Sequence, residues 1–412
     1  MSTAISITTK QSFYEKVIID LLSKMQLGTL NLVLPNNQTI KIGNGNSNIE
    51  ANIEIKDSNF FKRCVLYGDI GFGEAYTDGE WDTDNITNVI KWFLLNVDNA
   101  PVISGSSSKN FILNILKVFN KIYHSKKANS LDGSKKNISA HYDLNNEFFA
   151  LFLDDTMTYS SAYFKEEGMT LKAAQLAKYD RLCKQLNLNV NDHVLEIGSG
   201  WGGNAIYMAK NYNCKVTTVT ISEEQYKLAK ERVEKENLSD KISVVLKDYR
   251  LLEGKFDKIV SIEMLEAVGA EFYNTYFKKC SDLLKKDGIF VIQVITCPDS
   301  RFESLKNGVD WIQKHIFPGS LLPSVAAINK SINDTCDLTL VDLKDIGLDY
   351  AHTLKIWHQE FNKNIDKVKS LGFDDYFIRK WNYYLCYCEA AFAMRNINVL
   401  QLVYTRPNNT NR

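Results

Sequence analysis

The stretch that decides the fold is residues 195–203, which read L-E-I-G-S-G-W-G-G. An apolar run of strand-like residues leads into glycines, and a helical pattern follows from residue 204. A strand that turns through glycines into a helix places backbone N–H groups and the positive end of a helix at the carboxyl edge of a sheet. Open α/β sheets bind their ligands at that edge, so the sequence predicts a ligand site at this loop.

The residues on either side of this loop alternate between strand and helix patterns. Runs rich in Val and Ile, bounded by polar turns, are typical of strands buried on both faces. Because helical segments separate these runs, they predict an α/β fold with a parallel, doubly wound sheet. The expected strands are 192–198, 215–221, 242–247, 256–263 and 288–296, and the expected helices are 170–186, 204–211, 223–236 and 273–284.

The organisation outside this region is different. A small α+β domain is expected over 1–100, with a hairpin at 29–42 and a strand at 51–55. Ser- and Lys-rich segments over 101–140 indicate a linker with one helix, and residues 141–412 are expected to form the ligand-binding domain.

Composition limits the possible partners and compartments. The 412 residues carry 49 Lys and Arg against 49 Asp and Glu, so no net field attracts nucleic acid, and no nucleic-acid partner is expected. Eight scattered cysteines without a C-x-x-C pair indicate reduced thiols and no metal site. The sequence shows no signal peptide and no long uninterrupted apolar run, so a cytoplasmic protein, soluble or peripheral to a membrane, is expected.

The charge around the loop distinguishes between nucleotide ligands. The spacing G-x-G-x-x-G at 198–203 also occurs in NAD sites, but Glu196 in the preceding strand would repel a pyrophosphate. A carboxylate there can orient a ligand that carries an ammonium or sulfonium charge. The next strand ends without an acidic residue, at Thr220 and Ser222, with Gln225 after it. These features favour S-adenosylmethionine, while NAD and a purely structural glycine turn remain alternatives.

Six colinear motifs then show a resemblance to cyclopropane-fatty-acid-phospholipid synthases over residues 140–405, and the segment 68–83 resembles the N-terminal domain of the longer members. The motifs are HYDLNNEFFALFLDDTMTYSSAYF (141–164), EIGSGWGG (196–203), VTISEEQ (219–225), SIEMLEAVG (261–269), IFPGSLLPS (316–324) and DYAHTLKIWH (349–358).

The resemblance implies a Rossmann-like class I methyltransferase sheet with a helical lid. It also implies that an unsaturated phospholipid acyl chain attacks the methyl group of S-adenosylmethionine, and that the resulting carbocation loses a proton to a bound bicarbonate to form a cyclopropane. The implied partners are a phospholipid surface, on which the enzyme docks peripherally, and a second copy of the chain in a homodimer. The positions that match the family's cofactor pocket are Tyr159, Ser160, Glu196, Gly198, Gly200, Trp201, Gly202, Thr220, Ser222, Gln225, Tyr249 and Arg250.

The resemblance also implies a set of catalytic positions. Glu266 matches the glutamate beside the bicarbonate, and Tyr350 matches a tyrosine that bonds the anion and faces the cation. Ser161 and Ile295 match positions whose backbone N–H groups hold the anion. Cys388 matches a cysteine long treated as an active-site marker, although alkene methylation needs no thiolate and a lining role is the simpler interpretation.

Two positions depart from the family's pattern. Ser161 stands where members often have cysteine, and serine suffices if this position acts through its backbone N–H. Gln293 stands where many members have histidine, and glutamine cannot relay a proton. The alternative product is therefore a methyl- or methylene-branched chain, and a third hypothesis is a lipid-binding protein without catalysis. The aromatic residues Tyr383, Tyr384, Tyr387 and Phe392 are expected either to line an acyl tunnel or to form ordinary core.

Overall fold

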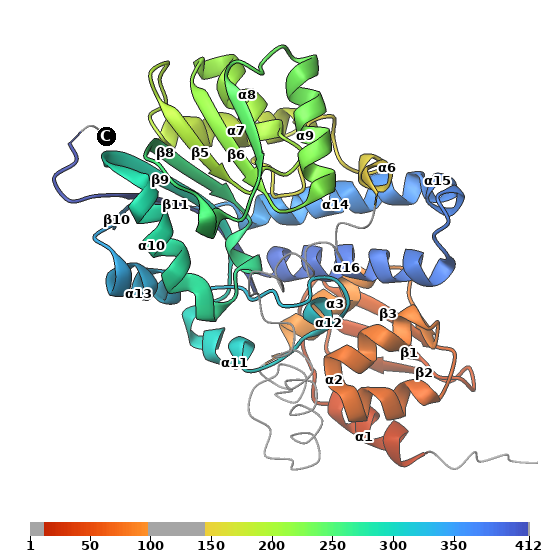
Figure 1. Ribbon diagram of the computed structural model, residues 1–412. Helices are drawn as coiled ribbons and strands as arrows, with labels where there is room; N and C mark the ends of the chain where they lie inside the picture. The colour runs from red at the N-terminus through yellow and green to blue at the C-terminus, as the bar shows by residue number, and fades with distance from the viewer. Residues whose placement is uncertain (1–11, 98–144, 411–412) are drawn as a thin grey trace, which may run out of the picture. The chain divides into compact units, whose positions relative to one another are not determined.

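A computed structural model describes residues 12–97 and 145–410. The chain divides into two compact units (Figure 1). Of the described residues, 12–97 and Asp375–Tyr383 belong to the first unit, and 145–374 and 384–410 belong to the second. The sequence did not indicate that Asp375–Tyr383 belongs with the N-terminal residues. The expected linker 101–140 and its helix lie outside the described residues and stay a prediction.

The first unit is built on a small sheet with the strand order β2-β1-β3-β4. The expected hairpin is present, because β1 and β2 pair antiparallel, while β1 and β3 pair parallel. The fully buried side chains of Trp81, Trp92 and Phe61 belong to the core of this unit. Its elements are α1 (Phe13–Leu22), β1 (Thr29–Val33), β2 (Thr39–Ile42), β3 (Glu50–Ile55), α2 (Asn59–Thr77), β4 (Trp81–Asp82) and α3 (Ile86–Leu95).

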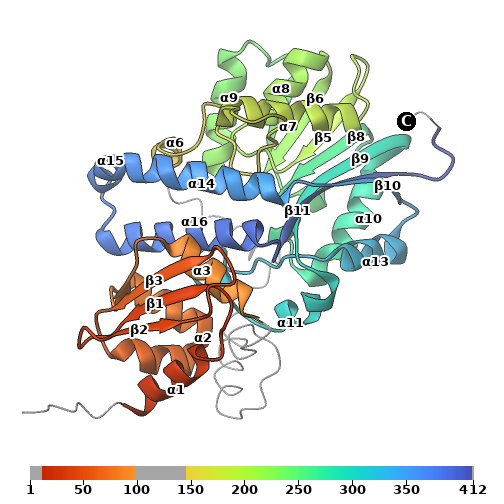
Figure 2. The ribbon, with the colours of Figure 1, turned by 180° about the vertical axis from the view of Figure 1, so that it is seen from behind.

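A seven-stranded sheet with the order β10-β11-β9-β8-β5-β6-β7 forms the centre of the second unit (Figure 2). The glycine loop joins β5 to α8, at the carboxyl ends of the parallel strands, as the sequence predicts. The first elements of the unit are α6 (Asn146–Ala150), α7 (Leu171–Gln185), β5 (His193–Ile197), α8 (Gly203–Tyr212), β6 (Lys215–Thr220), α9 (Glu223–Lys235), β7 (Ile242–Leu246), β8 (Phe256–Ile262), α10 (Tyr273–Leu283) and β9 (Leu284–Thr296).

The five strands that the sequence predicts are parallel, as expected, and two further strands that it did not indicate extend the sheet at one edge. Strand β11 pairs antiparallel with β9 over eight residues, and β10 pairs antiparallel with β11. The direction of a strand depends on its connection, which hydrophobic periodicity does not report. The remaining elements are α11 (Phe302–Lys306), α12 (Trp311–His315), α13 (Val325–Thr335), β10 (Thr339–Asp345), α14 (Gly347–Lys363), α15 (Ile365–Ser370), α16 (Asp375–Ala393) and β11 (Asn398–Thr405).

The sheet of the second unit is buried on both faces, which confirms the doubly wound arrangement. Along β9, Phe290 and Ile292 belong to one apolar cluster, with residues of α10 and α13. Ile289 and Val291, which alternate with them, belong to a second cluster with residues of α7 and α8. Alternate side chains of a strand point to opposite faces, so this sequence of apolar residues requires helices on both sides.

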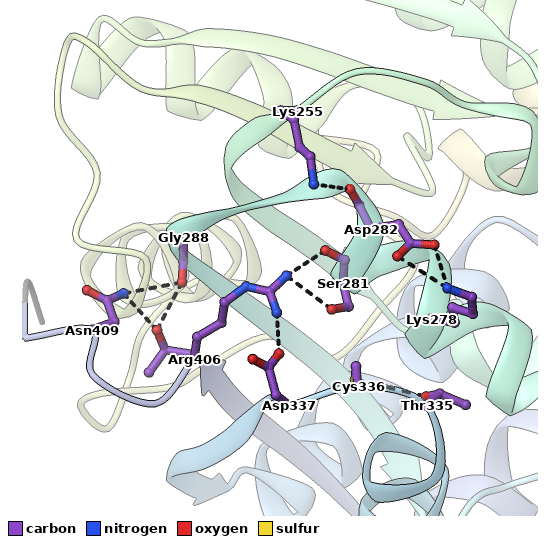
Figure 3. A network of polar contacts seen from close by, with 11 residues as sticks. Lys255, Lys278, Ser281, Asp282, Gly288, Thr335, Cys336, Asp337, Arg406 and Asn409 are labelled. Atoms are coloured by element: carbon purple, nitrogen blue, oxygen red, sulfur yellow. Dashed lines mark hydrogen bonds and ion pairs between the residues drawn. The ribbon is translucent and has the colours of Figure 1, made fainter.

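Polar contacts fix the chain after β11 against α10 and the start of β9 (Figure 3). The Arg406 guanidinium donates to the carbonyl oxygen of Ser281 at 2.7 Å and pairs with Asp337. The Asn409 amide donates to the carbonyl oxygen of Asp287 at 2.9 Å. These contacts tie the chain that follows β11 to α10 and to the start of β9.

Candidate active site

A cavity of about 410 Å³ lies in the second unit, at the carboxyl edge of the sheet. Its walls come from the ends of β5, β6 and β8 and from segments of α12, α14 and α16. Residues of all the sequence motifs described above line this cavity, from Tyr159 to Cys388. The fold therefore brings together segments that are more than 200 residues apart.

The glycine loop forms one wall of the cavity. Gly198, Gly200 and Gly202 have φ values of 95°, 47° and 83°, which residues with a side chain rarely adopt. A Cβ atom at Gly203 would lie 2.8 Å from the Thr156 carbonyl oxygen. These glycines allow the loop to turn tightly into α8 and keep the cavity open beside the backbone.

Glu196 lies buried at the end of β5 and lines the cavity. The Asn204 amide donates to its Oε1 at 2.8 Å, and the Thr218 hydroxyl donates to its Oε2 at 2.5 Å. Burial raises the pKa of Glu196 to about 7, and the two hydrogen bonds oppose that shift. A cationic ligand would favour the charged form of this carboxylate, as the sequence argument requires.

Polar groups at the ends of the neighbouring strands complete this part of the cavity. The Thr220 hydroxyl donates to Oε1 of Gln225 at 2.8 Å, so the two side chains hold one another. Arg250 forms an ion pair with Asp248 at 2.7 Å, beside Tyr249. Ten of the twelve predicted cofactor residues line the cavity, namely Tyr159, Ser160, Glu196, Gly198, Gly200, Trp201, Thr220, Gln225, Tyr249 and Arg250.

The other two predicted cofactor residues, Gly202 and Ser222, do not line the cavity but shape the helices beside it. Gly202 is the N-cap of α8, where a Cβ atom would lie 3.3 Å from the Ala229 side chain. The Ser222 hydroxyl accepts from the Gln225 backbone N–H at the start of α9. Trp201 lines the cavity, and its indole N–H donates to Oδ1 of Asn146 at 2.7 Å.

The predicted catalytic residues gather around the same cavity, at the carboxyl edge of the sheet. Glu266, Ile295 and Tyr350 line it, while Ser161 and Gln293 are buried beside it. The Ile295 backbone N–H donates to Oε1 of Glu266 at 2.5 Å. Burial, followed by repulsion from Glu263, raises the pKa of Glu266 to about 8.

Glu263, which the sequence analysis missed, lies at the centre of this group. The Ser161 backbone N–H donates to its Oε1 at 2.9 Å, and the Gln293 amide donates to the same oxygen at 2.8 Å. Its φ is 47°, a left-handed conformation that is rare for a residue with a side chain. An acidic residue at the carboxyl end of β8 was the available signal, since catalytic groups collect at that edge.

A chain of amides fixes the orientation of Gln293. The Arg181 guanidinium, which can only donate, bonds Oε1 of Gln401 at 2.8 Å. The Gln401 amide nitrogen therefore faces Gln293, and it donates to Oε1 of Gln293 at 2.9 Å. The nitrogen of Gln293 is left to face Glu263, so the Glu263 oxygen that it meets must act as an acceptor.

The bicarbonate implied by the resemblance does not fit these residues as expected. Its two backbone donors were to be Ser161 and Ile295, and each of these N–H groups already donates to a carboxylate of the chain. Gln293 likewise donates to Glu263. The donors that would hold a bicarbonate are thus bound to Glu263 and Glu266.

The far wall of the cavity is apolar and aromatic. Tyr384, Tyr387 and Phe392 line it, whereas Tyr383 belongs to the first unit and packs against Tyr76 at a ring distance of 5.7 Å. Cys388 also lines this wall, and burial raises the pKa of its thiol far above the usual range. A neutral thiol in an apolar wall supports the lining role over a catalytic one.

Comparison with known proteins identifies the family. Residues 129–402 match the model of the family described as mycolic acid cyclopropane synthetase. The chain belongs to this family. It is thus an S-adenosylmethionine-dependent methyltransferase of the cyclopropane synthetase family, as the glycine loop and the six motifs predict.

Relatives from two bacteria illustrate the range of this family. The chain is 37% identical to the tuberculostearic acid methyltransferase UfaA1 of Mycobacterium tuberculosis, over 84% of this chain and 81% of the relative. It is also 37% identical to the cyclopropane-fatty-acyl-phospholipid synthase of Escherichia coli, over 88% of this chain and 89% of the relative.

A solved structure supports the fold of this synthetase family member. The mycolic acid cyclopropane synthase CmaA1, in complex with SAH and CTAB, is 29% identical and superposes with a TM-score of 0.61. The match covers 66% of this chain and 98% of that structure. In the described part of this chain, no helix is long and apolar enough to cross a membrane, and no group of three or more His, Cys, Asp or Glu residues could hold a metal ion.

Proposed function

We propose that this enzyme alkylates the double bond of unsaturated phospholipid acyl chains with S-adenosylmethionine and forms cyclopropane fatty acids. The observation that carries the proposal is a single cavity that joins a glycine-loop site, with Glu196 for a cationic ligand, to an aromatic wall and to the carboxyl groups of Glu263 and Glu266. The similarity to the E. coli synthase supports the phospholipid substrate.

In this proposal one end of the cavity binds the cofactor and the other binds the acyl chain. Glu196, Thr220 and Tyr249 would hold the cofactor, whose sulfonium group supplies an electrophilic methyl. The aromatic side chains of Tyr384 and Tyr387 would hold the acyl chain, and Tyr350 would face the positive charge that develops on it. Tyr350 and Tyr384 are buried, so this end of the cavity excludes water, which would otherwise react with the carbocation.

The experiment that tests this function measures S-adenosylhomocysteine release with vesicles of monounsaturated phospholipid. Matched vesicles of saturated phospholipid are the control, and a soluble amine and a phenol serve as alternative acceptors. Turnover only with the unsaturated vesicles supports the proposal. Equal turnover with the amine or the phenol, or no turnover with any lipid, would contradict it and, in the second case, favour a lipid-binding protein without catalysis.

A second candidate product is a methyl- or methylene-branched chain. Gln293 in place of histidine favours it, together with the similarity to a tuberculostearic acid methyltransferase. Proton NMR of the extracted lipid distinguishes the products, because cyclopropane methylene protons resonate upfield of other lipid protons. An exocyclic alkene signal in their place would overturn the cyclopropane assignment.

The setting in the cell is part of the same proposal. A substrate that resides in a bilayer requires a protein that docks on the membrane surface from the cytoplasm, and a homodimer would present two such surfaces. Vesicle co-sedimentation and light scattering test these two points.

A further inference from the structure

We propose that the carboxylate of Glu263 takes the place of a bound bicarbonate and accepts the proton released during the reaction. This inference rests on the proposed function for its substrate, but its structural basis is independent of that function. Of the two backbone N–H groups that the family resemblance assigns to the anion, that of Ser161 donates to Glu263 and that of Ile295 donates to Glu266. The Gln293 amide also donates to Glu263.

The first argument is the geometry of the donors. Two donors, the Ser161 backbone N–H and the Gln293 amide, meet a single oxygen of Glu263 at 2.9 and 2.8 Å. A hydrogen bond from Tyr350 also favours the charged form of Glu263. A carboxylate and a bicarbonate share the same planar arrangement of two oxygens on carbon, so one can occupy the donors of the other.

The second argument is the fixed direction of those donors. Arg181 orients Gln401, and Gln401 orients Gln293, so that the Gln293 nitrogen always points at Glu263. A neutral histidine at this position also has one donor and one acceptor, but its ring holds them in a different geometry from that of the amide. It could not accept from Gln401 and donate to Glu263 in the same way. Gln293 is thus suited to hold the Glu263 carboxylate. This contact gives a physical reason for a glutamine where many members of the family have histidine.

The positive charge of Lys178 balances the negative charge of Glu263. Lys178 is fully buried, donates to the Ser160 hydroxyl at 2.7 Å, and interacts electrostatically with Glu263. Burial lowers the pKa of Lys178 to about 7, and the negative charge of Glu263 opposes that shift. A buried carboxylate without such a partner would be neutralised, so the lysine helps Glu263 to remain a base.

The fourth argument is the backbone of Glu263 itself. Its left-handed conformation, with φ at 47°, is unfavourable for a residue with a side chain. Such strain persists where the surrounding structure requires it, and it concentrates at functional sites. The strained backbone directs this carboxylate into the wall of the cavity, where Glu263 is a lining residue.

The chemical step balances without any further reactant. Methyl transfer moves the electron pair of the alkene into a new C–C bond, and the C–S pair departs with sulfur. The positive charge passes from sulfur to a carbon of the chain. Glu263 then accepts one proton from the new methyl group, and the released C–H electron pair closes the three-membered ring. The products are a phospholipid with an uncharged cyclopropane acyl chain, S-adenosylhomocysteine and a protonated Glu263.

The first test removes bicarbonate from the wild-type assay. In buffer freed of carbon dioxide, turnover with unsaturated vesicles should equal that in buffer with millimolar bicarbonate. Glu263→Gln should lower turnover about 10²–10⁴-fold, the usual contribution of a general base, while its affinity for S-adenosylhomocysteine stays unchanged. A wild-type enzyme that needs bicarbonate, or a Glu263→Gln variant that keeps its turnover, would overturn the proposal.

The second test uses binding and needs no turnover. Glycine suits the left-handed backbone at 263, so Glu263→Gly should fold and leave its donors open. Carbon-13 NMR of labelled bicarbonate should then show binding to Glu263→Gly and none to the wild-type protein, and bicarbonate should partly restore turnover of the variant. Binding by the wild-type protein would overturn the inference. Failure of the proposed function would appear separately, as an absence of lipid turnover with the NMR result intact.

Discussion

The amide nitrogen of Gln293 lies 2.8 Å from Oε1 of Glu263, on the strand next to the one that Glu263 follows. The Gln401 amide nitrogen, on β11, donates to Oε1 of Gln293 and so orients the Gln293 nitrogen toward Glu263. The pair links the sheet's antiparallel edge to the carboxyl group nearest the proposed reaction.

Replacing Gln293 with histidine should impair the enzyme. A neutral imidazole offers one donor and one acceptor, in a geometry different from that of the amide, so the contact with Gln401 or the contact with Glu263 is lost. We expect turnover to fall about tenfold, as for the loss of about 1.4 kcal/mol of hydrogen bonding. We also expect an additional limb in the pH profile near pH ~6.5.

The lipid product of Gln293→His should remain that of the wild-type enzyme, because Glu263 still accepts the proton. The measurements are the pH dependence of kcat and NMR of the extracted lipid. A change of product on this substitution would show that position 293, rather than Glu263, selects the product.

Replacing Gln401 with leucine should weaken catalysis from a distance. The leucine removes the donor to Gln293 and leaves the Arg181 guanidinium without this acceptor. The Gln293 amide is then free to turn, so kcat should fall while KM for S-adenosylmethionine stays constant. Thr405→Val on the same strand is the matched control, since its hydroxyl bonds the Gly288 carbonyl oxygen away from the cavity. An equal loss of kcat in both variants would point to a general effect on the sheet.

Glu196→Gln should weaken cofactor binding and change its pH dependence. Burial raises the pKa of Glu196 from its ordinary value of 4.5 to about 7, so the carboxylate charges as the pH rises through that value. Wild-type affinity for the cationic cofactor should therefore increase between pH ~6 and pH ~8, and the variant should show a weaker affinity without this increase. Isothermal titration at several pH values is the measurement.

The stability of the ligand-free protein should show the opposite trend. A carboxyl whose pKa is raised on folding stabilises the fold below its unfolded pKa, and the contribution is lost as the pH rises to the folded pKa. The advantage of Glu196→Gln over the wild-type protein in thermal unfolding should thus grow between pH 4.5 and pH 7. An advantage that does not change with pH would contradict the assignment of a buried, titrating Glu196.

Cys388→Ala should leave turnover almost unchanged. Burial raises the pKa of the Cys388 thiol far above neutrality, so the thiolate needed for nucleophilic chemistry is absent. The lost sulfur contact with the cavity should affect KM for long acyl chains more than kcat. Steady-state kinetics with vesicles of two chain lengths check this outcome, and a loss of kcat comparable to that of Glu263→Gln would contradict the lining role.

The local features of this protein can be read from its sequence. Glycines with positive φ, a buried carboxylate at the end of β5 and alternating apolar runs are each readable within a short window, because backbone sterics and periodicity are local. These features were enough to predict the doubly wound sheet and the S-adenosylmethionine loop, while the family was indicated by the resemblance of six motifs. They could not give the direction of β10 and β11, which depends on the connections between strands.

The arrangement around Glu263 depends on the tertiary structure and could not be predicted from the sequence. Ser161, Glu263 and Gln293 come from segments separated by as many as 132 residues, and Gln401 lies 108 residues beyond Gln293. A hydrogen bond between such segments leaves no periodic signal, since it depends on strand order and register. The sequence showed an unexpected glutamine, and the fold supplied the carboxylate that the glutamine holds.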